Sequence, residues 1–331
     1  MANKTILVTG GAGYIGSHVV RQLGEAGEQV VVLDNLCTGF KSAVLHGELV
    51  VGDTGDSTLV RQIINDYAVD TVMHFAAHTI VPESVEKPLK YYQNNTCSSR
   101  NLIECALEGQ VSNFVFSSTA AVYGIPGGGP VQEDSPTAPI NPYGTSKLMT
   151  EWMLRDVCAV NRMSCVALRY FNVAGCDPQG RIGQSTKEAT LLTKVACEVA
   201  LGKRDKLYIF GTDYDTPDGT GIRDYIHVED LSRAHLNALT YLRNGGESVT
   251  LNCGYGHGYS VREIIAAVEK THGHALPLEE ADRRPGDPPT LIARCDRIKS
   301  TLGWVPRYDD IEKIVTSALN WEKNLMKHSV E

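Results

Sequence analysis

Short apolar runs alternate with longer amphipathic stretches along the first 170 residues of the chain. Apolar runs bounded by glycine or polar residues predict buried strands, and the amphipathic stretches between them predict helices. Strands are predicted at 4–8, 29–33, 49–51, 71–75, 113–117 and 164–170, and helices at 57–67, 89–108 and 142–160 after a first one ending near residue 26. This α/β alternation predicts a doubly wound parallel sheet of the Rossmann type over residues 1–171.

The strand and helix pattern becomes less regular after residue 171. Helices are predicted at 189–201, 229–242, 261–270, 296–302 and 309–326, with a short strand at 207–211. Ser260 and Glu263 have the spacing of a capping box at the start of the 261–270 helix. We interpret residues 172–331 as a smaller C-terminal α/β domain, and we expect the chain to return to the first domain around residues 224–250.

Composition narrows the classes of function. The chain has 331 residues, of which 42% are hydrophobic, and this is enough for a well-buried core. The net charge is −8 and no basic run occurs, so we expect no nucleic acid partner. We find no leader segment and no apolar run of about 18 residues or more, so we expect a cytoplasmic protein with no membrane contact. Nine scattered cysteines without metal-ligand spacing predict small buried thiols and no metal site.

A glycine-rich turn joins the first predicted strand to the first helix. Gly10, Gly13 and Gly16 give the pattern G-x-x-G-x-x-G, which permits a tight turn and a close approach of backbone N–H groups to a pyrophosphate. The second strand ends in Asp34 and Asn35, 18 residues after Gly16. A carboxylate there accepts hydrogen bonds from an adenosine ribose and repels a 2′-phosphate, so the pattern favours NAD over NADP.

Tyr143 and Lys147 lie four residues apart on the helix that Asn141 caps and Pro142 opens. This spacing places a phenol beside an ammonium group on one helix face. A neighbouring cation favours the phenolate, and acid/base work near neutral pH requires the tyrosine pKa to fall by about 3 units. The pair alone does not decide the function, because Y-x-x-x-K is a common pattern.

Further candidate side chains follow the ends of other predicted elements. The hydroxyls of residues 117–119 end the fifth strand, at the same sheet edge as the glycine turn. Asp53 is either a ligand on the adenine side or a capping carboxylate. Arg223 and Arg284 are either ligands for a substrate diphosphate or surface ion-pair partners. Two histidines near the end of the fourth strand are interpreted as structural, namely His74 and His78.

Seven motifs in this order resemble the extended short-chain dehydrogenases/reductases, and among them the UDP-glucose 4-epimerases, over nearly the whole chain. The motifs are the glycine turn, Asp34-Asn35, Ser117-Ser118-Thr119, Tyr143-x-x-x-Lys147, Arg169-Tyr170-Phe171-Asn172, residues 223–228 and Arg284-Pro285-Gly286-Asp287. The resemblance implies an NAD-binding Rossmann domain, a UDP-sugar-binding second domain and a homodimer formed through helices near 90–108 and 143–160. It also implies an isomerase that interconverts UDP-glucose and UDP-galactose with tightly held NAD.

The resemblance also implies roles for individual residues. Tyr143 would take the proton of the sugar 4-hydroxyl while C4 passes hydride to NAD, and the resulting 4-keto sugar would receive hydride on its other face. Thr119 would hydrogen-bond the same oxygen, while Lys147 would hold the nicotinamide ribose and lower the tyrosine pKa. The implied NAD ligands are Gly10, Gly13, Tyr14, Ile15, Gly16, Asp34, Asn35, Asp53, Thr54, Phe75, Ala76, Ala77, Asn94, Ser117, Tyr143, Lys147 and Tyr170. The implied substrate ligands are Thr119, Tyr143, Phe171, Asn172, Leu191, Tyr208, Phe210, Arg223, Arg284 and Asp287, with Tyr208 and Phe210 near the uracil.

Some positions separate this chain from related enzymes. Ala120 and Ala121 stand where related dehydratases carry an acid and a base, so elimination lacks its catalysts. Thr79 replaces a lysine that some members place near the NAD pyrophosphate. Leu191 replaces an Asn or His that many members place against the uridine. Leu291 falls at the position that gates the sugar 2-substituent, and its intermediate size does not decide which sugar is accepted.

Two alternatives stay open at this stage. The chain could be a 4-epimerase of another UDP-sugar, namely the N-acetylglucosamine/N-acetylgalactosamine pair, a pentose or a uronic acid. It could also be an NAD-sensing regulatory protein without activity, although the presence of Tyr143, Lys147 and Thr119 disfavours this. The sequence does not distinguish galactose catabolism from the supply of sugar donors for polysaccharide.

Overall fold

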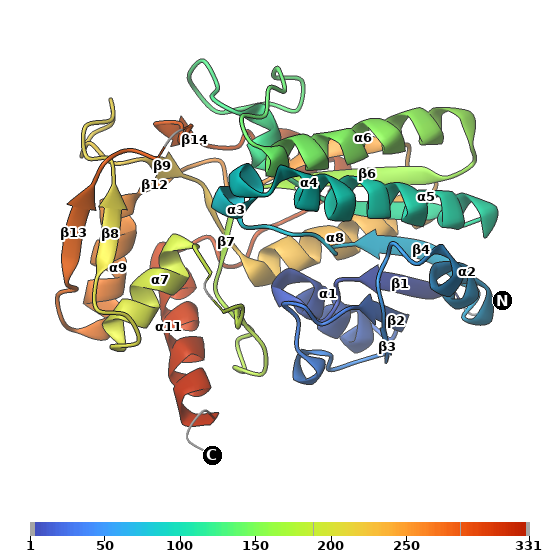
Figure 1. The fold of residues 1–331 in the computed structure, drawn as a ribbon, viewed down its shortest axis with the longest axis horizontal. Coiled ribbons are helices and arrows are strands. Elements are labelled where there is room, and N and C mark those ends of the chain that lie inside the picture. Colours follow the sequence, from blue (N-terminus) through green and yellow to red (C-terminus); the bar gives the residue numbers. More distant parts are fainter. Residues whose placement is uncertain (1–3, 188, 285, 329–331) are drawn as a thin grey trace.

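Seven parallel strands form the central sheet of the computed structural model, which describes residues 4–187, 189–284 and 286–328 (Figure 1). The strand order is β11-β6-β5-β4-β1-β2-β3. The strands are β1 (Thr5–Thr9), β2 (Gln29–Asp34), β3 (Glu48–Val51), β4 (Val69–His74), β5 (Asn113–Thr119), β6 (Ser164–Tyr170) and β11 (Val249–Cys253). The order reverses between β1 and β4, which is where doubly wound sheets bind their ligands. The predicted fold class is therefore confirmed.

Helices cover both faces of this sheet, and the central parts of its strands are therefore mainly apolar. One face carries α1 (Tyr14–Glu25) and α8 (Val228–Arg243), and the other carries α2 (Ser57–Asp66), α5 (Ser98–Glu108) and α6 (Pro142–Val160) (Figure 1). Each face has its own cluster of buried side chains. All five residues of β1 are buried, which explains why its sequence has no alternating polar positions.

The start of α6 has the predicted cap. The Asn141 side chain accepts a hydrogen bond from the backbone N–H of Gly144 at 2.8 Å, and Pro142 occupies the first turn. Tyr143 and Lys147 follow on the buried side of the helix, with 8% and 2% of their surfaces exposed. The cap and the apolar spacing therefore place both candidate catalytic side chains in the protein interior.

The predicted helix 89–108 is interrupted. It consists of α4 (Pro88–Tyr91), a wide π-helical segment η2 (Tyr92–Cys97) and α5. Within η2 the buried Asn95 accepts a hydrogen bond from the His78 backbone N–H at 2.8 Å and donates one to its carbonyl at 3.0 Å. This amide fixes the loop after β4. The sequence interpretation missed α3 (Val81–Glu86), which has a proline and an acidic residue in its first turn.

The second group of elements lies beside the central sheet, at the left of Figure 1. Here β8 (Leu207–Phe210) pairs with β13 (Leu278–Ala281), and β9 (Ile222–Arg223) lies between β12 (Tyr259–Ser260) and β14 (Thr290–Leu291). Its helices are α7 (Leu192–Ala200), α9 (Val261–His272) and α11 (Ile311–His328). The Ser260–Glu263 capping box at α9 is confirmed. The sequence predicted β8 from its apolar run but missed β9, β12, β13 and β14; β9, β12 and β14 have two residues each and are too short to show a period, and β13 begins with Leu278 followed by two glutamates.

The remaining elements connect the two groups. They are β7 (Asn172–Ala174), β10 (Tyr225–His227), α10 (Asp296–Leu302) and the short 3-10 helices η1 (Lys41–Ala43) and η3 (Ala120–Tyr123). After β10 the chain continues into α8 and then into β11, an edge strand of the central sheet. The division of the chain into two domains at residue 171 stays a prediction. No helix within the described part of the chain is long and apolar enough to cross a membrane.

Candidate active site

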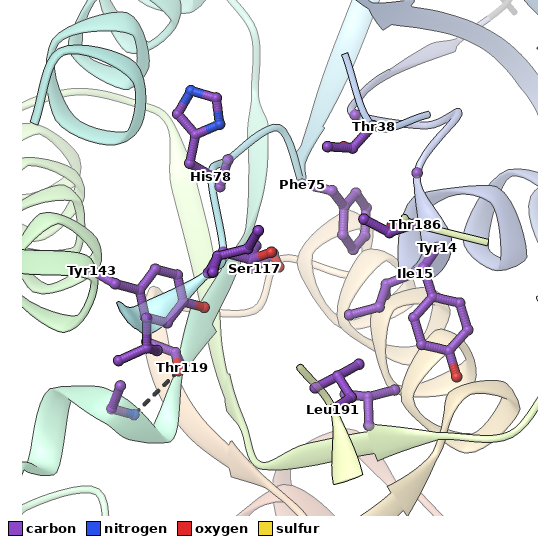
Figure 2. Close-up of a pocket in the computed structure, with 18 of the residues that line it drawn as sticks. Tyr14, Ile15, Thr38, Phe75, His78, Ser117, Thr119, Tyr143, Thr186 and Leu191 are labelled. Atoms are coloured by element: carbon purple, nitrogen blue, oxygen red, sulfur yellow. Dashed lines mark hydrogen bonds between the residues drawn. The ribbon is translucent and has the colours of Figure 1, made fainter. Parts of the chain in front are cut away.

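A cavity of about 440 Å³ opens at the carboxyl end of the sheet, beside the point where the strand order reverses (Figure 2). It brings together most of the residues that the sequence singled out. Those that line it are Gly10, Gly13, Tyr14, Ile15, Gly16, Asp34, Asn35, Asp53, Thr54, Phe75, Ala76, Ala77, Asn94, Ser117, Thr119, Tyr143, Tyr170, Phe171, Asn172, Leu191, Arg223 and Asp287. These residues are spread over 278 sequence positions, from Gly10 to Asp287, and the fold alone makes them neighbours.

The glycine turn is packed too closely to hold side chains. Gly10 has a φ of +71°, and a Cβ on it would lie 2.5 Å from the backbone N of Ala76. A Cβ on Gly16 would lie 2.2 Å from the carbonyl oxygen of Gly10. No side chain caps α1 at Gly13, so the first N–H groups of this helix stay available on the cavity wall. Such a helix start is suited to a pyrophosphate.

Two carboxylates shape the adjoining wall. Asp34 is buried and accepts hydrogen bonds from the backbone N–H groups of Ala12 at 2.9 Å and Leu36 at 2.8 Å, which ties β2 to the glycine turn. Asp53 accepts from Gly55 N–H at 2.8 Å and from the Asn35 side chain at 2.9 Å. Asp53 therefore stabilises a local turn and lines the cavity, while Asp56 caps α2, and the role of Asp53 as an adenine-side ligand stays a prediction.

The Tyr143 phenol lies on the cavity wall next to Thr119 (Figure 2). Burial raises the pKa of Tyr143 above its ordinary value, and a hydrogen bond with the Thr119 hydroxyl opposes this rise. Thr119 is held in place, since its Oγ1 accepts a hydrogen bond from Ala121 N–H at 3.1 Å. Its hydroxyl can therefore contact the same substrate oxygen as Tyr143.

Lys147 is buried behind the tyrosine and does not line the cavity. Its Nζ donates to the Ser117 carbonyl at 2.9 Å and lies 4.9 Å from the centre of the Phe116 ring. Burial lowers the pKa of Lys147 to about 7, and the Glu151 carboxylate opposes this shift. The expectation that Lys147 lowers the pKa of Tyr143 is therefore wrong for the polypeptide alone. Loss of water around both groups outweighs their mutual interaction.

The low pKa of Lys147 predicts a contribution to stability that depends on pH. This pKa is about 7 in the folded protein, against about 10.4 for an exposed lysine in an unfolded chain. Between these two pH values the unfolded chain binds more protons at this lysine than the folded protein does. The contribution of Lys147 to the free energy of unfolding therefore rises with pH and is lost as the pH falls toward 7. We expect the free energy of unfolding of the wild type, relative to Lys147→Met, to increase by about 2 kcal/mol from about pH 7 to about pH 9.

Urea unfolding of both proteins, freed of nucleotide, measures this difference. The variant is needed because burial also raises the pKa of thiols such as Cys197 and Cys295. Those thiols stay neutral in the folded protein while they ionise in the unfolded chain, which lowers stability at high pH. They contribute equally to both proteins and cancel in the comparison. A difference that does not change with pH would show that Lys147 keeps an ordinary pKa.

A second hydroxyl pair extends this wall. The Ser117 Oγ and the Tyr170 hydroxyl are 2.5 Å apart, and both residues line the cavity. Behind them, Arg169 forms a buried ion pair with Glu151 at 2.6 Å. Because Glu151 lies on α6 and Arg169 on β6, this ion pair holds the catalytic helix against the sheet.

Of the two predicted diphosphate ligands, Arg223 lines the cavity and Arg284 does not. Arg223 donates to the Ile222 carbonyl at 2.9 Å and forms an ion pair with Asp287 at 3.3 Å. The Arg284 guanidinium lies 3.9 Å from the centre of the Phe210 ring. Four predicted site residues are not part of the cavity wall, namely Lys147, Tyr208, Phe210 and Arg284. The assignment of Tyr208 and Phe210 to the uracil stays a prediction.

Sequence reasoning missed several wall residues, because most come from loops without a periodic pattern. They include Ile140, Gln184 and Thr186. His78 was interpreted as structural, but it also lines the cavity. His74 is structural as expected, since its ring hydrogen-bonds Thr9 at 2.6 Å and Ser99 at 2.7 Å. Burial lowers the pKa of His74 to about 3, so its ring is neutral.

One of the nine cysteines, Cys37, lines the cavity. All nine cysteines are free thiols. The expectation that they are buried is wrong for Cys37 and Cys97, which are exposed, while Cys158 is intermediate. No group of three or more candidate metal ligands was found among the described residues.

Comparisons with known proteins agree with this geometry. Residues 6–254 match the model of the NAD dependent epimerase/dehydratase family. The UDP-glucose 4-epimerase of Azospirillum brasilense is 56% identical over 98% of this chain and 93% of its own. The structure of UDP-glucose 4-epimerase from Brucella ovis in complex with NAD has a TM-score of 0.93 at 42% identity, covering 96% of this chain and 98% of that one. The UDP-Glc/GlcNAc 4-epimerase of Campylobacter jejuni has a TM-score of 0.86 at 50% identity, covering 97% and 99%.

Proposed function

We propose a function for this chain, which belongs to the NAD dependent epimerase/dehydratase family. It interconverts UDP-glucose and UDP-galactose by inverting C4, with NAD as its cofactor. One observation carries this proposal. A single cavity joins a glycine turn suited to a pyrophosphate, the Tyr143 phenol beside Thr119, and the Arg223 guanidinium.

The residues present fit NAD. The open helix start at Gly13 and the close approach of Gly10 to Ala76 leave space for a pyrophosphate against the backbone. The Asp34 carboxylate lines the cavity at the end of β2, where it can accept hydrogen bonds from an adenosine ribose. When bound, NAD supplies a hydride acceptor and later returns the hydride.

The chain itself moves the proton. Tyr143 accepts the proton of the sugar 4-hydroxyl and returns it after the sugar has turned, while Thr119 holds the same oxygen. Lys147 supports the strand end by its bond to the Ser117 carbonyl, and its assignment to the nicotinamide ribose stays a prediction. The Arg223 guanidinium faces the substrate diphosphate. Ala120 and Ala121 line the wall beside Thr119, so no second acid or base is present there to eliminate water.

The first experiment is a substrate test. We expect the purified protein, without added cofactor, to convert UDP-galactose to its 4-epimer, as followed by NMR. If no conversion occurs even after NAD is supplied, the assigned reaction is wrong. Leu191 would then be the first residue to replace, with Asn, because it cannot hydrogen-bond the uridine.

A second candidate reaction is the 4-epimerisation of N-acetylated UDP-hexosamines. Leu291 lines the cavity, and it is smaller than the tyrosine that would restrict the sugar 2-position. The Campylobacter jejuni relative is described as acting on both sugar types. The NMR test is therefore repeated with UDP-N-acetylgalactosamine for the wild type and for Leu291→Tyr. Conversion by the wild type but not by Leu291→Tyr would establish the second activity and show that residue 291 controls access of the sugar 2-substituent.

We also propose a cytoplasmic homodimer formed through α5 and α6. Trp152 on α6 is 46% exposed, and Leu89 beside η2 is 79% exposed, which leaves apolar surface on adjacent helices. We expect Trp152→Glu to convert a dimer into a monomer on light scattering, because it buries a charge in the helix contact. Val305→Glu is the matched control, since Val305 is 66% exposed on another part of the chain. A wild-type monomer would refute the dimer.

A further inference from the structure

Two cysteines lie side by side outside the candidate active site. Cys158 is near the end of α6, and Cys165 is the second residue of β6. Cys165 belongs to the apolar cluster under the sheet and Cys158 packs against that cluster, where the two side chains interact with each other and with Ser248. The Ser248 Oγ also accepts a hydrogen bond from the Cys165 backbone N–H at 3.0 Å. Two thiols from different elements thus lie side by side, seven residues apart in the chain.

The two thiols have different surroundings. Cys158 is partly exposed, whereas only 6% of Cys165 is exposed. The hydrogen bond from Cys165 lowers the pKa of the Cys158 thiol below its usual value. The same hydrogen bond and burial raise the pKa of Cys165 well above the usual range. Cys158 therefore has the features of an attacking thiolate, and Cys165 those of a resolving thiol that forms the disulfide in a second step.

We propose that Cys158 and Cys165 form an oxidisable thiol pair, which is a modification site for a peroxide. The Cys158 thiolate attacks one peroxide oxygen, the O–O bond breaks, and Cys158 becomes a sulfenic acid while the other oxygen leaves as water or an alcohol. The Cys165 sulfur then attacks the Cys158 sulfur. The S–O bond breaks, the disulfide forms, and hydroxide leaves as water with the proton of Cys165. Two thiols are oxidised and one peroxide is reduced.

Cys158 lies on another face of α6 than the exposed Met149. It lies nine residues after Met149, and nine residues at 100° each correspond to about half a turn around the helix axis. Cys158 and Met149 therefore lie on opposite faces of α6. The packing agrees, because Cys158 contacts the apolar cluster under the sheet while Met149 is exposed.

Tryptic cleavage separates the two cysteines and makes the proposal testable. Cleavage after Arg155, Arg162 and Arg169 places Cys158 in peptide 156–162 and Cys165 in peptide 163–169. The reduced full-length protein is treated with hydrogen peroxide near neutral pH, alkylated, digested and analysed by mass spectrometry. We expect the two peptides to be joined by a disulfide that dithiothreitol reverses, with the loss of two hydrogen atoms from the intact mass.

Two variants and an internal control make the result specific. In Cys165→Ser the sulfenic acid at Cys158 should persist and react with a dimedone-type reagent, and in Cys158→Ser the Cys165 thiol should stay alkylatable. Cys253 and Cys295 are also neighbours, but both are buried and have raised pKa values, so they should stay reduced. Separate, fully alkylated peptides 156–162 and 163–169 at a dose that oxidises the exposed Cys37 would overturn the proposal.

Discussion

Replacement of Tyr143 by phenylalanine is expected to lower turnover by about 10³-fold or more, while NAD stays bound. The substitution removes only the hydroxyl that accepts the substrate proton. The ring is buried, with 8% of its surface exposed, and phenylalanine keeps its packing against the start of α6. Turnover of UDP-galactose by NMR and the amount of nucleotide released by acid from the purified protein measure the two expectations separately.

The control for this variant is Tyr241→Phe. Tyr241 lies on α8 and is not part of the cavity wall, so loss of its hydroxyl should leave turnover unchanged. Near-normal turnover of the Tyr143 variant would remove this residue from the mechanism. Loss of both turnover and bound NAD would instead indicate a structural role for Tyr143, because the assigned function leaves the cofactor in place.

The sequence was sufficient to predict the elements whose local signals agree with the packing. For α6, the Asn141 cap, Pro142 in the first turn and the buried positions after them all specify the same helix, and the structure confirms it. The buried strands β1 and β6 were similarly clear, because each contains a short apolar run, at 6–8 and 165–168, between polar residues.

Other features depend on tertiary contacts that leave no local pattern. The wall residues Gln184 and Thr186 come from an irregular loop, and only the three-dimensional path of the chain brings them to the cavity. The effect of Lys147 was mispredicted for a related reason. Helical spacing predicts that Tyr143 and Lys147 lie close together. The loss of water around Lys147 depends instead on neighbours from β5, such as Phe116 and the Ser117 carbonyl.

Gly16→Ala is expected to abolish retention of NAD. We expect it to lower turnover by a factor similar to that of Tyr143→Phe. A Cβ at this position would lie 2.2 Å from the Gly10 carbonyl oxygen and 2.9 Å from the Gly11 Cα. Both contacts are with backbone atoms that cannot rotate away, so the start of α1 must move away from the end of β1. That movement separates the helix N–H groups from the pyrophosphate position, and overpacking of this kind costs about 1–3 kcal/mol of stability.

Gly127→Ala provides the matched control, because a Cβ on Gly127 meets no atom within 4 Å. Both variants add one methyl group to a glycine, so a difference between them reports the packing of the turn and not the loss of glycine flexibility. Acid release of nucleotide and thermal unfolding of the two proteins test this directly. If Gly16→Ala retained NAD as the wild type does, close approach at this turn could not be the basis of cofactor binding, and the fit of the cavity to NAD would need another explanation.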